Sequence, residues 1–403
     1  MIILDVIVIG AGASGLCSAI VMARNGVNVT VLDKLSVSGK KLLVTGNGRC
    51  NYWNEDFDNK HFFSNNSNFI NDVNTLENRK MVLDFFDSIG IVPVIKNGYY
   101  YPMSMQASSV RDSLILEAKR LGVKFINDAN VTDIRKDNQK YIVCYGDNKI
   151  ISDKVVIACG SYSYYKEKTN GYDLCKRLGH TIKKVMPSLV QLVGSDDFYN
   201  EWDGVRSGAK VGVYVDNELK KEEIGEIMLT NYGVSGICIF NLSGIANRAL
   251  SDNKNVKIKI NFLPEIDNLF EFLENRSNMI DYTLYDFLIS LLNFKLVNLI
   301  LKECNLNRDK KWKDLNDIEK NTLVEKISTF VVNIIDSKSF LDAQVSTGGV
   351  DTLEIYSRTM ESKINKGLYI VGEILDVDGD CGGYNLGFAW LSGIIAGRSV
   401  VND

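Results

Sequence analysis

Short apolar runs and helix-like spacing alternate at the start of the chain. The run "DVIVIG" is rich in β-branched residues, "LCSAIVMARNG" has the spacing of a helix closed by Gly26, and "VNVTVLDK" is a second apolar run that includes Asp33. Continuous apolar runs of this length are typical of parallel strands buried on both faces. This end of the chain is therefore predicted to form a strand–turn–helix–strand unit of an α/β domain.

The pattern changes in the middle of the chain. From Ser188 to Phe262, apolar and polar residues alternate, which predicts an antiparallel β-domain. After Pro264 the apolar spacing becomes three and four, which predicts helices, before strands return ahead of Thr347. We therefore expect an α/β domain (1–187 and 347–403) interrupted by a barrel-like β-domain (188–263 and 329–346), which carries a helical insert (264–328).

The turn after the first strand has the G-x-G-x-x-G pattern of Gly10, Gly12 and Gly15. The first glycine allows a tight turn, the second lets a pyrophosphate approach the backbone, and the third lets the helix pack on the strand. The helix N-terminus offers unpaired N–H groups to the phosphates. Asp33 follows Gly15 by 18 residues, where a carboxylate binds a ribose hydroxyl. The unit therefore predicts dinucleotide binding.

The C-terminal segment indicates which dinucleotide is bound. The apolar strand "LYIVG" is followed at once by Glu373, and Gly382 and Gly383 open an apolar helix that we place from about Asn385. A carboxylate at the end of such a strand can bind a ribityl hydroxyl, which FAD has and NAD lacks. The positive end of the helix would stabilise negative charge on the reduced flavin ring. These features favour FAD.

Composition narrows the class of protein. The 403 residues carry a net charge of −4, so the chain lacks the excess of basic residues that is typical of proteins that bind nucleic acid or an anionic membrane. The eight cysteines form no C-x-x-C pair and only two histidines are present, so we expect no metal site and free thiols in a reducing cytoplasm. The apolar N-terminus carries Asp5 and is broken by glycines, so we expect a soluble strand there and no membrane span.

The chain resembles the BaiN-like family of FAD-dependent oxidoreductases, which includes the aminoacetone oxidase-like flavoproteins. The motifs that carry the resemblance are "VIGAGASGL", "GKKLLVTGNGRCN", "VVIACGSYSY", "TNYGVSGICIFNLSG", "STGGV", "TMESK" and "GLYIVGEILDVDGDCGGYNLGFAW". They extend over nearly the whole chain. The resemblance implies a Rossmann-type, glutathione reductase-like FAD domain, with the β-domain serving the substrate.

The resemblance also implies which residues bind FAD. The loop from Gly39 to Asn51 is expected to wrap around the cofactor, Val131 to contact the adenine through its backbone, and the turn 158–160 to close over it. Lysine and arginine suit phosphates, and glycines suit close backbone approach. The expected cofactor residues are Gly10, Gly12, Ala13, Ser14, Gly15, Asp33, Lys34, Lys40, Lys41, Thr45, Gly48, Arg49, Cys50, Asn51, Val131, Ala158, Cys159, Gly160, Gly372, Glu373, Gly383, Tyr384, Asn385 and Leu386.

The sequence leaves the reaction open between alternatives. The one that we favour is reduction of a conjugated C=C beside a carbonyl in a steroid-like substrate, with NADH or NADPH as a transient reductant, because the inserted domains could build a roomy apolar pocket. Others are oxidation of a small amino-ketone such as aminoacetone and a flavin-binding regulator without turnover. No second G-x-G-x-x-G offers a nicotinamide site, and no residue pattern identifies a catalytic acid or base. For Tyr384 and the tyrosines of residues 97–108, packing is the simpler role. For His180, after a helix-ending glycine, we expect a surface or capping position. The sequence carries no signal for an oligomeric state.

Overall fold

The computed structural model describes residues 4–163 and 170–402 and divides the chain into two compact units. Unit 1 consists of residues 1–185 and 345–403, and unit 2 of residues 186–344. The chain thus forms the first part of one unit, completes the second, and returns to finish the first.

A five-stranded parallel sheet with the order β20-β11-β1-β2-β7 forms the centre of unit 1. Its strands are β1 (Asp5–Ile9), β2 (Asn28–Leu32), β7 (Lys124–Ile126), β11 (Lys154–Ile157) and β20 (Leu368–Ile370). The buried valines and isoleucines of these strands explain the apolar runs, since a parallel sheet is covered on both faces. The predicted Rossmann-type fold is confirmed.

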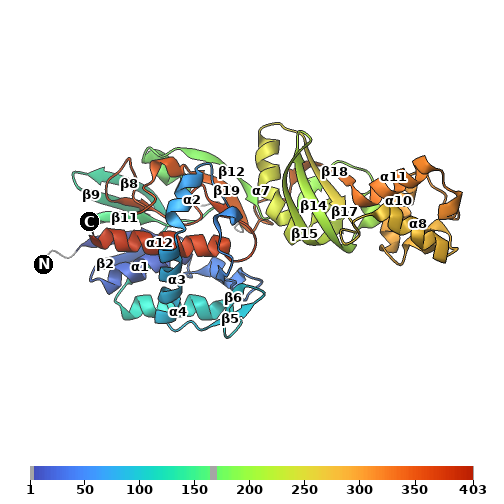
Figure 1. Cartoon of the computed structure of the whole chain (residues 1–403). Helices are drawn as coiled ribbons and strands as arrows, with labels where there is room; N and C mark the ends of the chain where they lie inside the picture. Colours follow the sequence, from blue (N-terminus) through green and yellow to red (C-terminus); the bar gives the residue numbers. More distant parts are fainter. Residues whose placement is uncertain (1–3, 164–169, 403) are drawn as a thin grey trace. The chain divides into compact units, whose positions relative to one another are not determined.

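Two long helices, α1 (Ala13–Arg24) and α12 (Tyr384–Asn402), lie side by side in unit 1 (Figure 1). They approach closely because α12 presents glycines to α1. A Cβ on Gly393 would lie 2.3 Å from the carbonyl oxygen of Ser14, and one on Gly397 would lie 2.9 Å from that of Ser18. The N-terminal and C-terminal motifs, far apart in sequence, therefore meet in the fold.

The remaining elements of unit 1 are short sheets and helices around this centre. The antiparallel sheets are β8 (Val131–Asp137), β9 (Lys140–Tyr145) and β10 (Asn148–Ser152); β3 (Trp53–Asn54), β6 (Tyr99–Pro102) and β5 (Pro93–Lys96); and β4 (Phe62–Phe63) with β21 (Asp378–Gly379). The helices are η1 (Lys40–Val44), η2 (Asn59–His61), α2 (Ser67–Val73), α3 (Leu76–Ser88), α4 (Ala107–Arg120), α5 (Gly171–Arg177) and η4 (Thr352–Glu354). Strand β12 (Ile182–Ser188), whose last three residues are counted in unit 2, pairs with β19 (Val345–Val350).

Unit 2 is a closed barrel with a helical insert. The barrel order is β13-β16-β15-β14-β17-β18, formed by β13 (Leu192–Gly194), β14 (Arg206–Val215), β15 (Glu218–Thr230), β16 (Gly233–Ser235), β17 (Val256–Asn261) and β18 (Phe330–Ser337). Between β17 and β18 the chain forms α8 (Leu269–Met279), α9 (Leu284–Leu288), α10 (Phe294–Glu303), η3 (Trp312–Asp314) and α11 (Asp317–Ser328) (Figure 1). Burial of Ile258, Phe330 and Trp312 unites the barrel and the insert in one core.

The structure differs from the sequence interpretation in three places. Residues 188–262 are not continuously β, because α7 (Ile237–Ser251) and the short helix α6 (Tyr199–Trp202) interrupt the strands. The C-terminal helix begins at Tyr384, one residue before Asn385. His180 is not on the surface but 3% exposed, bonded to Glu354 at 3.0 Å and to the Ser362 hydroxyl at 2.9 Å.

Within residues 4–163 and 170–402, no helix has the length and apolar character that a membrane crossing requires.

Candidate functional site

The turn between β1 and α1 has the geometry expected of a phosphate-binding loop. Gly10 has φ +107°, and a Cβ there would lie 2.3 Å from the Ala158 carbonyl oxygen. A Cβ on Gly15 would lie 2.0 Å from the carbonyl oxygen of Gly10, so helix and strand pack too closely for any side chain. Gly12 is different, because a Cβ there would meet nothing within 4 Å. The turn is therefore tight on its protein side and open at Gly12.

The N-terminus of α1 fits an anionic group. Gly12 is the N-cap and supplies no side-chain hydrogen bond, and the first turn contains no acidic residue. The first N–H groups of a helix lack partners inside the helix, and the helix dipole adds partial positive charge there. An open N-cap with these properties suits the pyrophosphate of a dinucleotide.

Asp33 lies at the carboxyl end of β2, beside this turn. One carboxylate oxygen accepts the N–H of Ala11 at 2.7 Å, and the other accepts the N–H of Leu35 at 2.8 Å. Burial raises the pKa of Asp33, and the two backbone hydrogen bonds offset part of that effect. The carboxylate thus fixes the glycine turn, and its remaining acceptor capacity is available to a ribose hydroxyl.

Glu373 is the centre of a polar cluster at the ends of β11 and β20. Its Oε1 accepts the hydroxyls of Ser161 at 2.8 Å and Ser163 at 2.9 Å and the N–H of Ser346 at 3.2 Å. Its Oε2 accepts the ammonium of Lys41 at 2.6 Å. Four segments separated in sequence meet here. We call these five residues the Glu373 cluster.

The three serines of the Glu373 cluster were missed by sequence reasoning. Ser161 and Ser163 lie in the motif "GSYSY" and Ser346 begins "STGGV", so the motifs contained them without a reason to single them out. A serine has no periodic signature, and the contact between Ser161 and Ser346 joins residues 185 positions apart. Only the fold brings them together.

The loop from Gly39 to Asn51 contacts the Glu373 cluster through one of its three cations. Lys41, on η1, reaches it, whereas Lys40 and Arg49 are exposed. Thr45 donates its hydroxyl to the Leu42 carbonyl at 2.6 Å and so ends η1. Cys50 is fully buried, which raises the pKa of its thiol to about 12. The loop therefore offers two exposed cations and an inert thiol.

Other predicted residues of this region occupy well-defined positions. The amide of Asn51, oriented to satisfy both neighbours, donates to the carbonyl oxygens of Trp53 and Tyr100. Gly48 accepts the N–H of Ala107 at 2.8 Å. The Val131 carbonyl accepts the side-chain amide of Asn170. The turn 158–160 lies beside Gly10 and is open at Gly160, where a Cβ would meet nothing within 4 Å.

The start of α12 is fixed by backbone and aromatic contacts. Gly383 has φ +96°, and a Cβ there would lie 2.8 Å from the Trp53 carbonyl oxygen. Tyr384 is 4% exposed and stacks on His61 with 4.4 Å between ring centroids. The side chain of Asn385 donates to the Gly379 carbonyl at 2.7 Å, which holds the turn before the helix. Tyr384 is thus packed in an aromatic group.

A buried hydroxyl beside the Glu373 cluster has no partner. Tyr172, on α5, is 3% exposed, and its hydroxyl makes no hydrogen bond to any residue that the structure describes. Burial and the nearby carboxylate of Glu373 raise the pKa of Tyr172 well above its usual value. An unpaired buried hydroxyl is costly and calls for an explanation, for which a bound ligand is one candidate. Together with the open Gly12 and the uncapped helix, it fits a polar cofactor such as FAD.

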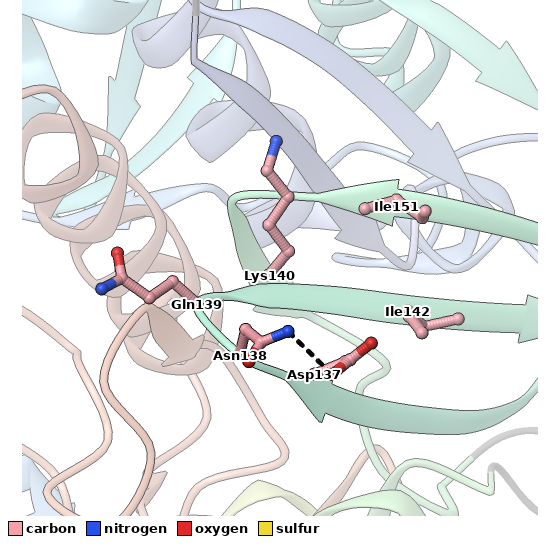
Figure 2. A pocket seen from close by; sticks show the side chains of 6 residues that line it. All are labelled: Asp137, Asn138, Gln139, Lys140, Ile142 and Ile151. Carbon is pink, nitrogen blue, oxygen red and sulfur yellow. Dashed lines mark hydrogen bonds between the residues drawn. The ribbon is translucent and has the colours of Figure 1, made fainter.

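One depression of the surface lies away from the expected cofactor residues. A shallow depression at the β8–β9 hairpin is lined by Asp137, Asn138, Gln139, Lys140, Ile142 and Ile151 (Figure 2). Its side chains belong to one exposed hairpin and to the neighbouring strand, and it contains none of the expected cofactor residues. Within the part of the chain that the structure describes, no group of three or more His, Cys, Asp or Glu side chains could hold a metal ion.

Comparison with known proteins identifies the family. The model of the HI0933-like protein Rossmann domain matches residues 4–399. The chain is 34% identical over 399 residues to the 3-dehydro-bile acid delta(4,6)-reductase of Clostridium scindens, covering 97% of this chain and 98% of the relative. It is 27% identical over 391 residues to the ribosomal RNA dihydrouridine synthase of Escherichia coli, covering 96% of each.

A solved structure shares the fold. The 3-ketosteroid-delta4-(5alpha)-dehydrogenase of Rhodococcus jostii, in complex with 4-androstene-3,17-dione, superposes with a TM-score of 0.50 at 14% identity, covering 99% of this chain and 97% of that one. The family match spans nearly the whole chain, and the relative at 34% identity covers it almost completely. The chain therefore belongs to the HI0933-like family of FAD-dependent oxidoreductases.

Proposed function

We propose that this flavoenzyme reduces a conjugated C=C bond beside a carbonyl group in a small steroid-like substrate, with NADH or NADPH as reductant. In the balanced reaction, the substrate, NAD(P)H and one proton give the saturated product and NAD(P)⁺. The observation that carries the proposal is the 34% identity over 97% of the chain to a reductase of a bile acid intermediate.

FAD, when bound, supplies the two-electron redox chemistry. We propose that the chain holds it in unit 1 through the residues predicted from the sequence. The N-terminus of α1 with Gly12 would face the pyrophosphate, and Asp33 would bind the adenosine ribose. The Glu373 cluster would lie at the ribityl side. Unit 2, with the boundaries predicted for the β-domain and its insert, would serve the substrate.

A second candidate is reduction of uridine in RNA, because two of the relatives are named ribosomal RNA dihydrouridine synthases. Dihydrouridine differs from uridine by saturation of a C=C bond beside a carbonyl, so the bond chemistry is of the same class. Charge favours the small substrate, since the net charge of the chain is −4 and acidic side chains outnumber basic ones in residues 186–344. RNA binding depends mainly on neutralising phosphates with lysine and arginine.

The test is reduction of the bound flavin followed by turnover. The holoenzyme is mixed without oxygen with NADH, NADPH or aminoacetone, and the flavin absorbance is followed. The reduced enzyme is then given a 4-en-3-one steroid, a uridine-containing RNA, or no acceptor. We expect bleaching by one nicotinamide and recovery of the flavin colour with the steroid, with one saturated product per flavin.

Other outcomes would contradict the proposal. Recovery only with RNA would support the second candidate. Bleaching by aminoacetone, but by neither nicotinamide, would support the amino-ketone oxidase. A flavin that neither nicotinamide nor amine reduces would support the regulator without turnover.

A further inference from the structure

Four donors of the chain itself already bond the carboxylate of Glu373. A carboxylate offers about four lone-pair sites for hydrogen bonds. Oε1 accepts three donors, from Ser161, Ser163 and the Ser346 N–H, at 2.8, 2.9 and 3.2 Å, and Oε2 accepts Lys41 at 2.6 Å. Oε1 is therefore fully occupied, and the acceptor site that remains is on Oε2, beside the Lys41 ammonium.

The three serines of the Glu373 cluster are buried and bonded to its carboxylate or to one another. Their exposed fractions are 6% for Ser161, 0% for Ser163 and 1% for Ser346. The hydroxyl of Ser346 donates to that of Ser161 at 3.0 Å, and the hydroxyls of Ser161 and Ser163 are 3.0 Å apart. Because these hydroxyls are mutually bonded and buried, they hold the carboxylate in one orientation and are inaccessible to a ligand.

Lys41 is the accessible member of the cluster. Its side chain is 28% exposed, against 17% for that of Glu373. An ammonium group has three donors. Two of them bond Ser163 and Glu373, each at 2.6 Å, which leaves one N–H for a further acceptor. The pairing also orders a flexible four-carbon side chain before any ligand arrives, so less entropy is lost on binding.

We propose that Lys41, rather than Glu373, is the side chain of this cluster that contacts FAD, donating its third N–H to an oxygen atom of the cofactor. Glu373 is then a positioning residue that holds the ammonium in place, with the three serines behind it. This inference rests on the proposed placement of FAD in unit 1. It assigns Glu373 a different role from the direct ribityl contact that its sequence position predicts.

A double-mutant cycle on FAD affinity separates the two roles. The apoprotein of each variant is titrated with FAD, and binding is followed by quenching of flavin fluorescence. Lys41→Met removes a charge-assisted hydrogen bond, and we expect FAD to bind about 10- to 150-fold more weakly. Glu373→Gln releases the ammonium and weakens binding by no more than Lys41→Met does. In the Lys41→Met background, Glu373→Gln has no further effect beyond about 2-fold, since nothing remains to be positioned.

Lys183→Met is the matched control. Lys183 also pairs with a mostly buried carboxylate of unit 1, that of Asp351 at 2.8 Å, and its side chain is 37% exposed. We expect its FAD affinity to stay within about 2-fold of the unchanged protein. If Lys41→Met fails to fold, Lys41→Gln replaces it in the cycle, because glutamine keeps a hydrogen-bond donor without the charge. Thermal unfolding of each apoprotein shows whether the variant is folded.

The outcomes distinguish this inference from the proposed function. Two outcomes would show that Glu373 contacts FAD itself and would overturn the inference. One is that the effects of Lys41→Met and Glu373→Gln multiply in the double variant, and the other is that Glu373→Gln weakens FAD binding while Lys41→Met does not. Unchanged affinity in both would remove FAD from this cluster and overturn both the inference and the proposed placement. Failure of the reductase assay with the expected cycle intact would overturn only the proposed reaction.

Discussion

At the scale of single residues, a few buried polar atoms of the described chain have no hydrogen-bond partner, and the hydroxyl of Tyr172 is one of them. Asp33 and Glu373 accept several hydrogen bonds each, whereas the hydroxyl of Tyr172 makes none. A buried donor without a partner costs about 1–3 kcal/mol of desolvation. Such a cost is tolerated where another state of the protein supplies the partner, and the position of Tyr172 near Glu373 suits a role with bound FAD.

Tyr172→Phe is therefore expected to stabilise the apoprotein by about 1–3 kcal/mol, because it removes an unpaired hydroxyl and keeps the ring. Urea unfolding of the apoprotein measures the change. Tyr141→Phe is the matched control in the same unit, since its hydroxyl donates to the Lys366 carbonyl at 2.8 Å and the residue is fully buried. That variant should lose about 0.5–1.5 kcal/mol. A loss of stability in both would mean that Tyr172 has a partner, such as a buried water.

Cys50 should resist thiol reagents in the folded protein. It is fully buried, and burial raises the pKa of its thiol to about 12, so the reactive thiolate is rare at pH 8. We expect iodoacetamide to leave Cys50 unmodified in the native protein and to modify it in urea, as read by mass spectrometry of peptides. Rapid labelling of Cys50 in the native protein would contradict its burial.

At the scale of elements, what the sequence could predict depended on how local the signal was. The β1–α1 turn and Asp33 were found because strand, turn and helix follow one another within a few residues. Helix α7 was missed because it is as rich in apolar residues as the flanking strands, and a largely buried helix lacks the polar face that reveals the period. His180 was misplaced because its partners, Glu354 and Ser362, come from a distant segment.

Two glycines of the α1–α12 region should behave in opposite ways when changed to alanine. Gly12→Ala should leave the stability of the apoprotein unchanged, because φ is −84° and a Cβ meets nothing within 4 Å, but it should weaken FAD binding at the phosphate-binding turn. Gly393→Ala should lower stability by about 1–3 kcal/mol, because its Cβ would lie 2.3 Å from the Ser14 carbonyl oxygen. Urea unfolding and FAD titration of both variants check this. Equal FAD affinity for Gly12→Ala would show that no phosphate approaches there.

The contact between His180 and η4 should make stability depend on pH. Burial lowers the pKa of His180, although Glu354 partly opposes this. The unfolded chain protonates the histidine near pH 6.5, before the folded protein does, so stability should fall as the pH drops below about 6.5. Urea unfolding at about pH 7.5, 6.5 and 5.5 measures the slope. His180→Gln, which does not titrate, should flatten it, and an equal slope in both proteins would rule out His180 as the source.

At the scale of the whole molecule, the sequence predicted part of the division into two units. The change from helix-like to alternating spacing of apolar residues predicted where the β-domain begins. Expected cofactor residues lie near both ends of the chain, so both ends were expected in one domain. Closure of the barrel was only suggested, because β13 pairs with β18 across more than a hundred residues and no local pattern records such a contact. The Glu373 cluster escaped for the same reason, since its members come from four segments.

All the residues expected to bind FAD lie in unit 1, and this predicts where the cofactor will slow hydrogen exchange. A ligand that binds only the folded state, at a hundred times its dissociation constant, stabilises by about 2.7 kcal/mol. Amides that exchange by local opening near the site should therefore slow by up to about 100-fold, in residues 10–15, 39–51, 158–163 and 372–386. Exchange in the barrel strands β14 and β17 should stay unchanged, because their core belongs to unit 2. Mass spectrometry of peptides from apoprotein and holoprotein measures both regions at once. Protection of the barrel strands without protection of the β1–α1 turn would move the cofactor out of unit 1 and contradict its proposed placement.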